Sequence, residues 1–415
     1  MRLLKLGIYP VVYLDQFYAS RPQLASEPYT VQFEALIGDC FGSSDFWTRA
    51  LRDLGYETLD LIANAEALQK RWATEHDLSY QEDDWLFEIA LAQIKAFSPA
   101  ALIVADYSTI SAAFLRQLRR ECPSIHLIIG WCGAPYRDAE VFQEWDIVLS
   151  CIPELVDHFQ SNGHNSFHLN HAFDARILEK LNHPKEPAVD FSFIGSVLKQ
   201  NQFHLEREKI LLSLLEQTNL RIWSHLPLAP PSVPNTLSPR SIARNMFQTA
   251  QAFGVPARLL AAAPFVRRAA RLDPASSDFQ FVDSRIVRRS GPALFGLEMF
   301  QKLRASRVTL NTHIDISPLS ASNMRLFEAT GVGSCLITDW KANIAELFEP
   351  DVEVLTYRHP DECVEKVKYI LDHESERCAI AVAGQRRTSH EHTFTSRASR
   401  IDEIINDSVR RVASV

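Results

Sequence analysis

Polar side chains are concentrated in residues 310–339, between two apolar runs that are typical of strands. Asn323, Arg325 and Glu328 follow one another closely there and supply an amide, a forked cation and a carboxylate. Arginine binds phosphate oxygens through two parallel hydrogen bonds. A helix that begins beside these residues would present free backbone N–H groups to the same anion. This set of groups suits a diphosphate and the neighbouring hydroxyl groups of a ribose or sugar.

The same residues also have ordinary structural interpretations. Glu328 could cap or pair on an exposed helix face, and Arg325 could form an ion pair at the surface or between domains. His204 and His313 could equally form hydrogen bonds within a core, because a single histidine says little about function. The glycines that follow Glu328 often only end a helix and turn the chain.

The elements that must position this cluster follow an α/β rhythm, in which apolar runs alternate with helical patterns. This rhythm predicts parallel sheets covered by helices. Strands are expected at residues 3–14, 57–62, 101–105, 126–130, 147–150, 166–169, 190–195, 220–223, 308–311, 334–338 and 352–357. Helices are expected at residues 45–54, 112–120, 154–162, 207–215, 324–330, 360–373, 375–390 and 395–412. Ligands of such sheets bind beyond the carboxyl ends of strands, which is where the polar cluster would lie.

The length of 415 residues predicts two domains, each able to bury its own core. A polar, proline-bearing stretch at residues 182–188 is typical of a linker. We therefore expect a first domain at residues 1–185, a second at 186–394 and a helix at 395–415. Residues 226–296, approximately, break the rhythm and suggest a basic insertion, because residues 225–308 hold twelve Lys or Arg against four Asp or Glu.

Composition excludes several classes of protein. The chain is 46% hydrophobic and 23% charged, as globular proteins are, and its net charge of -8 argues against nucleic acid as a partner. Its seven cysteines are dispersed, with no CxxC pair, so we expect reduced thiols and no metal site. No apolar run approaches the roughly 18 residues of a membrane span, which favours a cytoplasmic location. The P-loop, G-x-G-x-x-G and G-x-S-x-G motifs are missing, which disfavours NTP hydrolysis, dehydrogenation and serine esterase chemistry.

The segment NMRLFEATGVGSCLITD resembles the N-x-R-x-F-E-x-x-G-x-G element of the CgeB-like, group-1-related glycosyltransferases. Other segments agree in the same order. DFSFIGS, followed by His204 and Arg207, resembles that family's strand, Gly-Ser turn and H-x-x-R, and SRVTLNTH resembles its S-K-I-x-L-N-x-H strand. Residues 344–371 and 379–394 resemble its C-terminal region. The resemblance covers residues 190–402 apart from the basic insertion, and the collinear order of the segments makes it specific.

This resemblance implies a GT-B fold, in which two Rossmann-like domains with parallel sheets face each other. The first domain would bind an acceptor and the second a nucleotide-sugar donor, which is a substrate and not a cofactor. No metal would be required. The matched positions that would form the donor site are Gly195, Ser196, His204, Arg207, Asn311, His313, Asn323, Arg325, Glu328, Gly331 and Gly333.

The implied reaction moves a sugar from the nucleotide donor to a glycan, a lipid-linked glycan or a protein. Related retaining families carry two glutamates that are separated by seven residues, but Ser320 stands in place of the first, so the stereochemical outcome stays open. Two other readings also stay open. One is a non-catalytic binding or structural protein with the GT-B shape, and the other is a different activated-sugar enzyme, such as an epimerase or a phosphoribosyl transferase.

An inverting transfer needs a base beside the acceptor hydroxyl. Asp45 lies at an expected helix start that Ser43 and Ser44 could cap, and Asp106 directly follows the third strand. Either aspartate could face the cleft, and we prefer Asp45, although an ordinary cap or turn role is open for both.

The arginines of the basic insertion could contact an anionic membrane, on its inner face, or a lipid-diphosphate acceptor. A solvated helical face, or packing against the first domain, would explain them equally well. The arginines concerned are Arg258, Arg267, Arg268, Arg271, Arg285, Arg288 and Arg289.

Overall fold

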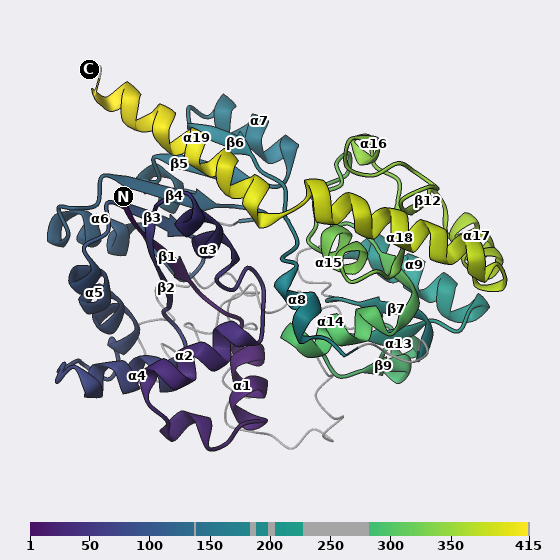
Figure 1. Cartoon of the computed structure of the whole chain (residues 1–415), viewed down its shortest axis with the longest axis horizontal. Coiled ribbons are helices and arrows are strands. Elements are labelled where there is room, and N and C mark those ends of the chain that lie inside the picture. Colours follow the sequence, from purple (N-terminus) through teal and green to yellow (C-terminus); the bar gives the residue numbers. More distant parts are fainter. Residues whose placement is uncertain (137, 183–187, 198–203, 227–281, 414–415) are drawn as a thin grey trace, which may run out of the picture.

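The computed structural model describes residues 1–136, 138–182, 188–197, 204–226 and 282–413. They form two α/β units that lie side by side (Figure 1). Each unit is built on a six-stranded sheet, with strand orders β2-β1-β3-β4-β5-β6 and β12-β11-β10-β7-β8-β9. All described strand pairs of the two sheets are parallel. The expected α/β architecture with two parallel sheets is therefore confirmed.

The first sheet uses the N-terminal strands of the chain. These are β1 (Arg2–Gly7), β2 (Glu57–Ile62), β3 (Ala101–Val104), β4 (Leu127–Trp131), β5 (Ile147–Ser150) and β6 (Ser166–His168). The helices of this unit are α1 (Val11–Ala19), α2 (Tyr29–Gly38), α3 (Phe46–Asp53), α4 (Glu66–Glu75), α5 (Trp85–Phe97), α6 (Ala112–Glu121) and α7 (Pro153–Ser161), with short 3-10 turns η1 (Leu24–Ser26) and η2 (Glu140–Glu144). Helix α8 (Arg176–Lys180) connects the two units.

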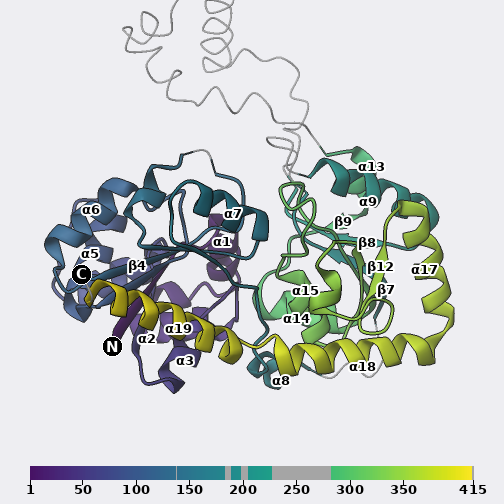
Figure 2. The same ribbon diagram turned by 90° about the horizontal axis from the view of Figure 1, so that it is seen from above.

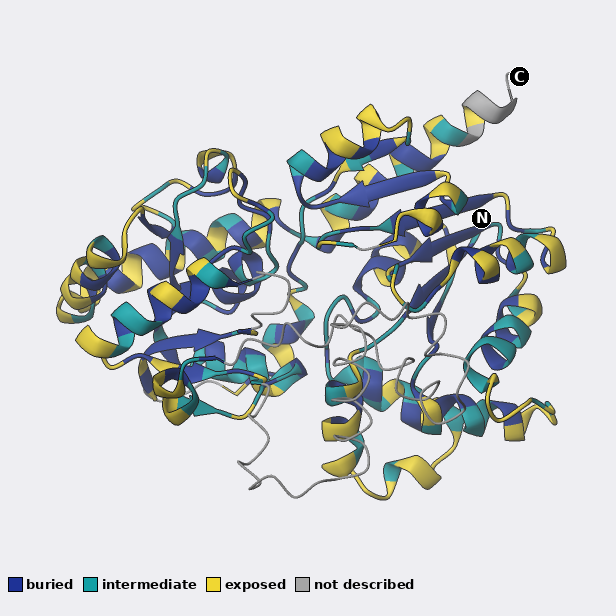
Figure 3. Cartoon of the chain, turned by 180° about the vertical axis from the view of Figure 1, so that it is seen from behind, coloured by how far each residue is buried: buried dark blue, intermediate teal, exposed yellow. Residues whose placement is uncertain are grey.

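The second sheet holds β7 (Val189–Ile194), β8 (Arg221–Trp223), β9 (Ser290–Gly291), β10 (Ser306–Asn311), β11 (Cys335–Asp339) and β12 (Leu355–Tyr357). Its described helices are α9 (Leu205–Gln217), α13 (Ser284–Arg289), α14 (Gly296–Arg304), α15 (Arg325–Gly331), α16 (Ile344–Leu347), α17 (Pro360–Asp372) and α18 (Glu374–Glu391). Buried residues follow the strands and the helix faces that cover them (Figure 3). Both sheets are covered on two faces, which explains their continuous apolar runs.

The single strand expected at residues 3–14 is wrong in its second half. The strand ends at Gly7, and α1 begins after Pro10, which occupies the N-cap position. Proline removes a ladder donor from a strand but is tolerated where a helix begins, because the first N–H groups of a helix have no partner within it. Tyr13, Leu14 and Phe17 of α1 are buried at the spacing of one helix face.

The C-terminal helix α19 (Phe394–Ala413) leaves the second unit and returns to the first, where it packs on α3. Figure 2 shows α18 and α19 running one after the other across the two units. Ile401, Ile404 and Ile405 are buried in this contact, and the Tyr56 hydroxyl donates to Asp402 Oδ1 at 2.6 Å. The helix thus joins the two units after the sheets are complete.

The two places where the chain passes between the units touch each other. The backbone N–H of Phe173 donates to the carbonyl oxygen of His392 at 2.8 Å. The Phe173 ring lies so close to Gly331 that a Cβ atom at that position would be 2.4 Å from it. A side chain at residue 331 would therefore push the two segments apart.

Candidate functional site

A cleft of about 380 Å³ lies between the two units, at the carboxyl ends of their strands. The second unit contributes the loops after β7 and β10 and the beginning of α15, and the first unit contributes the loops after α2, β4, β5 and β6. Seven of the eleven residues expected in the donor site line the cleft, and these are Gly195, Ser196, Arg207, Asn311, Asn323, Arg325 and Glu328.

Arg207 places a positive charge inside the wall of the second unit. Arg207 is 6% exposed, and its guanidinium donates to the carbonyl oxygens of Ser196 at 2.8 Å and Thr312 at 2.7 Å. Burial lowers the pKa of Arg207 to about 10, so the group is still charged at neutral pH. The hydrogen-bond partners of this guanidinium within the described residues are all neutral. A buried cation without an ion pair is costly, and an anion in the cleft would offset that cost.

His204 supports this arginine from behind the wall. Its Nε2 atom lies 3.0 Å from Arg207 Nη1. Burial, together with the charge of Arg207, lowers the pKa of His204 to about 3, so the ring is neutral and can accept a hydrogen bond from the guanidinium. The structure therefore gives His204 a supporting position and does not place it in the lining of the cleft.

Two asparagines connect the polar loops of the second unit. Asn323 Nδ2 donates to Asn311 Oδ1 at 2.8 Å, and Asn311 Nδ2 donates to Thr338 Oγ1 at 2.9 Å. Within the described part of the chain, the buried Asn323 Oδ1 atom has no hydrogen-bond partner. Because unsatisfied buried acceptors are rare, this oxygen marks a place where a ligand hydroxyl or N–H would bind.

His313 lies behind the loop after β10. Its Nδ1 atom contacts Asp339 Oδ1 at 2.7 Å, and its side chain is fully buried. Burial of Asp339 acts to raise its pKa, but His313 and Lys341 outweigh that effect and lower the pKa to about 2. The pair holds the ends of β10 and β11 together. His313 is not part of the cleft lining, in contrast to the expectation.

Glu328 and Arg325 lie together in α15 and both line the cleft. Glu328 Oε2 is 2.9 Å from Arg325 Nη1, and the Glu328 side chain is only 9% exposed, which excludes an exposed helix face for it. Burial raises the pKa of Glu328, and Arg325 counteracts part of that rise. A carboxylate held this way can accept hydrogen bonds from the vicinal hydroxyl groups of a ligand. The Arg325 guanidinium can at the same time donate to an anionic group of that ligand.

The first unit contributes His171, which the sequence analysis missed. His171 follows β6, lines the cleft and packs against the Trp131 ring with centroids 5.1 Å apart. Burial, reinforced by the charge of Arg397, lowers the pKa of His171 to about 3, so its ring is neutral. Its only signal in sequence is its position after a short strand, which it shares with many residues.

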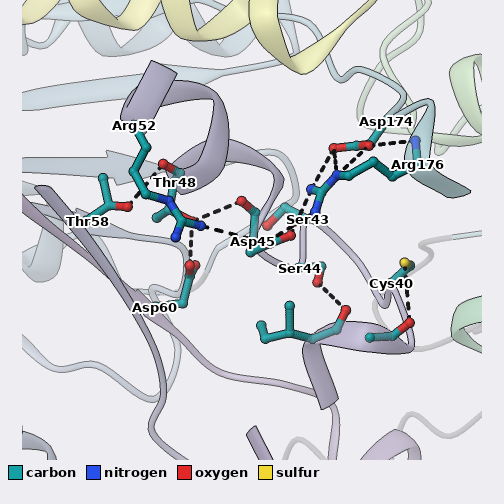
Figure 4. Close-up of polar contacts among 12 residues, drawn as sticks. Cys40, Ser43, Ser44, Asp45, Thr48, Arg52, Thr58, Asp60, Asp174 and Arg176 are labelled. Atoms are coloured by element: carbon teal, nitrogen blue, oxygen red, sulfur yellow. Dashed lines mark hydrogen bonds and ion pairs between the residues drawn. The ribbon is translucent and has the colours of Figure 1, made fainter. Parts of the chain in front are cut away.

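The structure gives Asp45 a structural role. Its carboxylate lies between Arg176, at 2.9 Å, and Arg52, at 3.8 Å (Figure 4). Helix α3 begins at Phe46 without a side-chain cap, and the Ser44 hydroxyl donates to the carbonyl oxygen of Ile37. Asp45 is not among the residues that line the cleft, because Arg176 of the connecting helix holds its carboxylate elsewhere.

Asp106 is also bound within its own loop. Its Oδ1 atom accepts the backbone N–H groups of Thr109 at 2.6 Å and Ile110 at 2.9 Å. Such a turn satisfies backbone donors after a strand. Asp106 does not line the cleft, and neither do Gly331, which packs on Phe173, and Gly333, which has a φ of +83° where the chain turns after α15.

Much of the basic insertion lies outside the described residues, including Arg258, Arg267, Arg268 and Arg271. Of the described arginines, Arg285 pairs with Asp283 and Glu216, which leaves Arg288 and Arg289 exposed on α13. None of the described helices is long and apolar enough to cross a membrane. The described residues hold no group of three or more His, Cys, Asp or Glu side chains placed to bind a metal ion.

Comparisons with solved structures identify the fold. The chain is similar to Anabaena HepE in complex with UDP and glucose (11% identity, TM-score 0.53, 98% of this chain and 100% of that one). It is also similar to a sucrose-phosphate synthase from Thermosynechococcus elongatus (9% identity, TM-score 0.52, 99% and 100%) and to a glycosyltransferase from Rickettsia africae (8% identity, TM-score 0.50, 98% and 98%). The architecture is thus the GT-B fold, as expected.

The sequence itself matches a family model at residues 240–403, and this model describes Glycosyl transferase-like proteins. The matched region contains the polar loops after β10 and all of α15. No curated protein matches the chain in sequence.

We predict that Asp45→Asn lowers the free energy of unfolding by about 1 kcal/mol, because Arg176 loses one of its two carboxylate partners. Urea denaturation would measure this change. Asp53→Asn, on the exposed end of the same helix, should leave stability unchanged. An unchanged free energy of unfolding in Asp45→Asn would show that the ion pair between Asp45 and Arg176 does not stabilise the fold.

Proposed function

We propose that the protein transfers a sugar from a nucleoside-diphosphate donor to an acceptor hydroxyl. The observation that carries this proposal is the buried guanidinium of Arg207, which has neutral hydrogen-bond partners and lies at the ends of β7 and β10 in the cleft. A diphosphate is the part of such a donor that would compensate this charge. The match to the Glycosyl transferase-like family model and the GT-B fold support the same activity.

The donor would lie along the wall of the second unit. Its diphosphate would contact Arg207, Arg325 and the backbone at Gly195 and Ser196. Glu328 would then accept hydrogen bonds from ribose or sugar hydroxyl groups. UDP is the first nucleotide to test, because HepE, which shares the fold, is described in complex with UDP and glucose.

In the reaction, the acceptor oxygen bonds to the anomeric carbon while the bond from that carbon to the diphosphate oxygen breaks. The leaving diphosphate takes the electron pair, and Arg207 and Arg325 stabilise its added charge. We propose that His171, on the opposite wall, accepts the proton of the acceptor hydroxyl in an inverting transfer. Its low pKa makes it a weak base alone, but the bound diphosphate would raise that pKa because it is negative.

Other parts of the proposal rest on sequence. Membership in the CgeB-like subfamily, a glycan, lipid-linked or protein acceptor, a cytoplasmic location and contact with an anionic membrane follow from the resemblance and the basic insertion. Metal independence is supported by the two cleft arginines, which can neutralise a diphosphate.

We predict that UDP raises the melting temperature of the protein and that Glu328→Ala weakens UDP binding by about tenfold, because a buried acceptor for the ribose hydroxyls is lost. At about 100 times its dissociation constant, UDP should stabilise the wild type by roughly 2.7 kcal/mol. Glu365→Ala, exposed on α17, is the matched control and should behave as the wild type. Equal UDP affinity in Glu328→Ala and the wild type would show that Glu328 does not contact the nucleotide.

We predict that His171→Asn lowers the rate of UDP-glucose hydrolysis by about 100-fold with UDP affinity retained, because a proton acceptor is removed. The neutral ring is the active form, and bound donor raises its pKa. kcat/KM reports the free protein, in which the pKa of His171 is about 3, so between about pH 5 and 8 the wild-type kcat/KM should stay level while kcat falls towards acid. His171→Asn should lose this acid limb. If His171→Asn keeps the acid limb of kcat unchanged, another group accepts the proton.

A further inference from the structure

A second cavity, of about 170 Å³, adjoins the cleft on the side of the first unit. His171 and Met324 line both spaces, so the two share a wall. The second cavity lies between the sheet of the first unit and the helices α3 and α19. Its other walls are mostly aromatic and aliphatic, and include Trp47, Trp131, Phe394, Ile103, Leu149 and Ile401.

Aromatic rings form a continuous series along these walls. The Trp47 and Trp131 rings have centroids 6.0 Å apart, and the Trp47 and Phe394 rings are perpendicular, with centroids 5.1 Å apart. Trp131 also packs on His171, the residue at the boundary with the cleft. Rings arranged in this way offer both faces and edges to a planar guest.

The cavity is open to the outside. Ala105, just after β3, lines it and is an exposed residue, whereas a sealed packing void would have only buried walls. A cavity of about 150 Å³ is large enough to hold a molecule the size of benzene. The space next to the cleft therefore fits a single six-membered ring.

Among the described residues that line this cavity, the one cation already has its partners. Lys5 is 5% exposed, and its ammonium group pairs with Asp60 Oδ1 at 2.9 Å and donates to the carbonyl oxygen of Ser44. The charge of Lys5 is thus compensated, so this wall has no free positive charge that would bind an anionic ligand. An uncharged ring suits the cavity better than a phosphate or a carboxylate.

We propose that this cavity binds an aromatic or other apolar six-membered ring of the acceptor, whose hydroxyl group then lies at His171 beside the donor. The inference rests on the proposed function, because it names the acceptor class of the same site. It predicts that the ring and the nucleotide bind at the same time, in adjacent spaces separated by His171 and Met324.

The probe for this proposal is 4-fluorobenzyl alcohol, followed by ¹⁹F NMR on the full-length protein. We expect saturable broadening of its resonance, both in the absence of UDP and at saturating UDP. Ala105→Phe should weaken probe binding by about tenfold, because the new ring fills the cavity from its exposed edge. Ala379→Phe, exposed on α18, is the control and should bind the probe as the wild type does.

Three outcomes would overturn the proposal: the wild type does not bind the probe, UDP displaces it, or Ala105→Phe binds it unchanged. The UDP melting shift of the same samples separates this failure from a failure of the proposed function. A protein that binds UDP but not the probe loses only the acceptor inference. A protein that binds the probe but not UDP loses the donor site, and with it the assignment of the ring to an acceptor.

Discussion

The site depends on one energetic constraint, which is the cost of burying the charged guanidinium of Arg207. Arg207 is removed from water at the ends of β7 and β10. Its guanidinium donates to the neutral carbonyl oxygens of Ser196 and Thr312, whereas its buried Nε atom has no hydrogen-bond partner among the described residues. Asp339 and Asp315 favour the charged form of Arg207 but form no ion pair with it among the described residues, and burying a charge that is not paired destabilises the folded state. This preorganised cation lies at the end of parallel strands, where ligands of such sheets bind. An anion bound there would offset the cost of burying the charge.

The opposite wall depends on the C-terminal helix. Arg397, in the first turns of α19, donates through Nε to the carbonyl oxygens of Asn170 and His171. The same helix packs on α3 through Ile401 and Ile404 and contributes to the apolar cavity beside the cleft. The position of His171 is therefore fixed by a segment more than two hundred residues later in the chain. The geometry of the cleft therefore depends on how α19 packs against the first unit.

Much of the fold could be predicted because strands buried on both faces are apolar runs that end at turns. β2 and β5 have the predicted bounds, whereas β9, with two residues, carries too little pattern to be recognised. Seven expected donor-site residues do line the cleft, since they follow strands or begin a helix. Asp45 met the same sequence criterion, but Arg176, 131 residues away, binds its carboxylate. His171 went unnoticed because its place in the cleft follows from tertiary packing, which local pattern does not reveal.

The most direct test of the account is a calorimetric titration of UDP into the wild type, Arg207→Lys and Arg207→Met, each first shown to be folded by its melting curve. The account predicts that Arg207→Met binds about 100-fold more weakly than the wild type, because the charge that compensates the diphosphate is gone, and that Arg207→Lys, which keeps the charge but not the fork, lies between them. Equal affinity of all three proteins for UDP would contradict it.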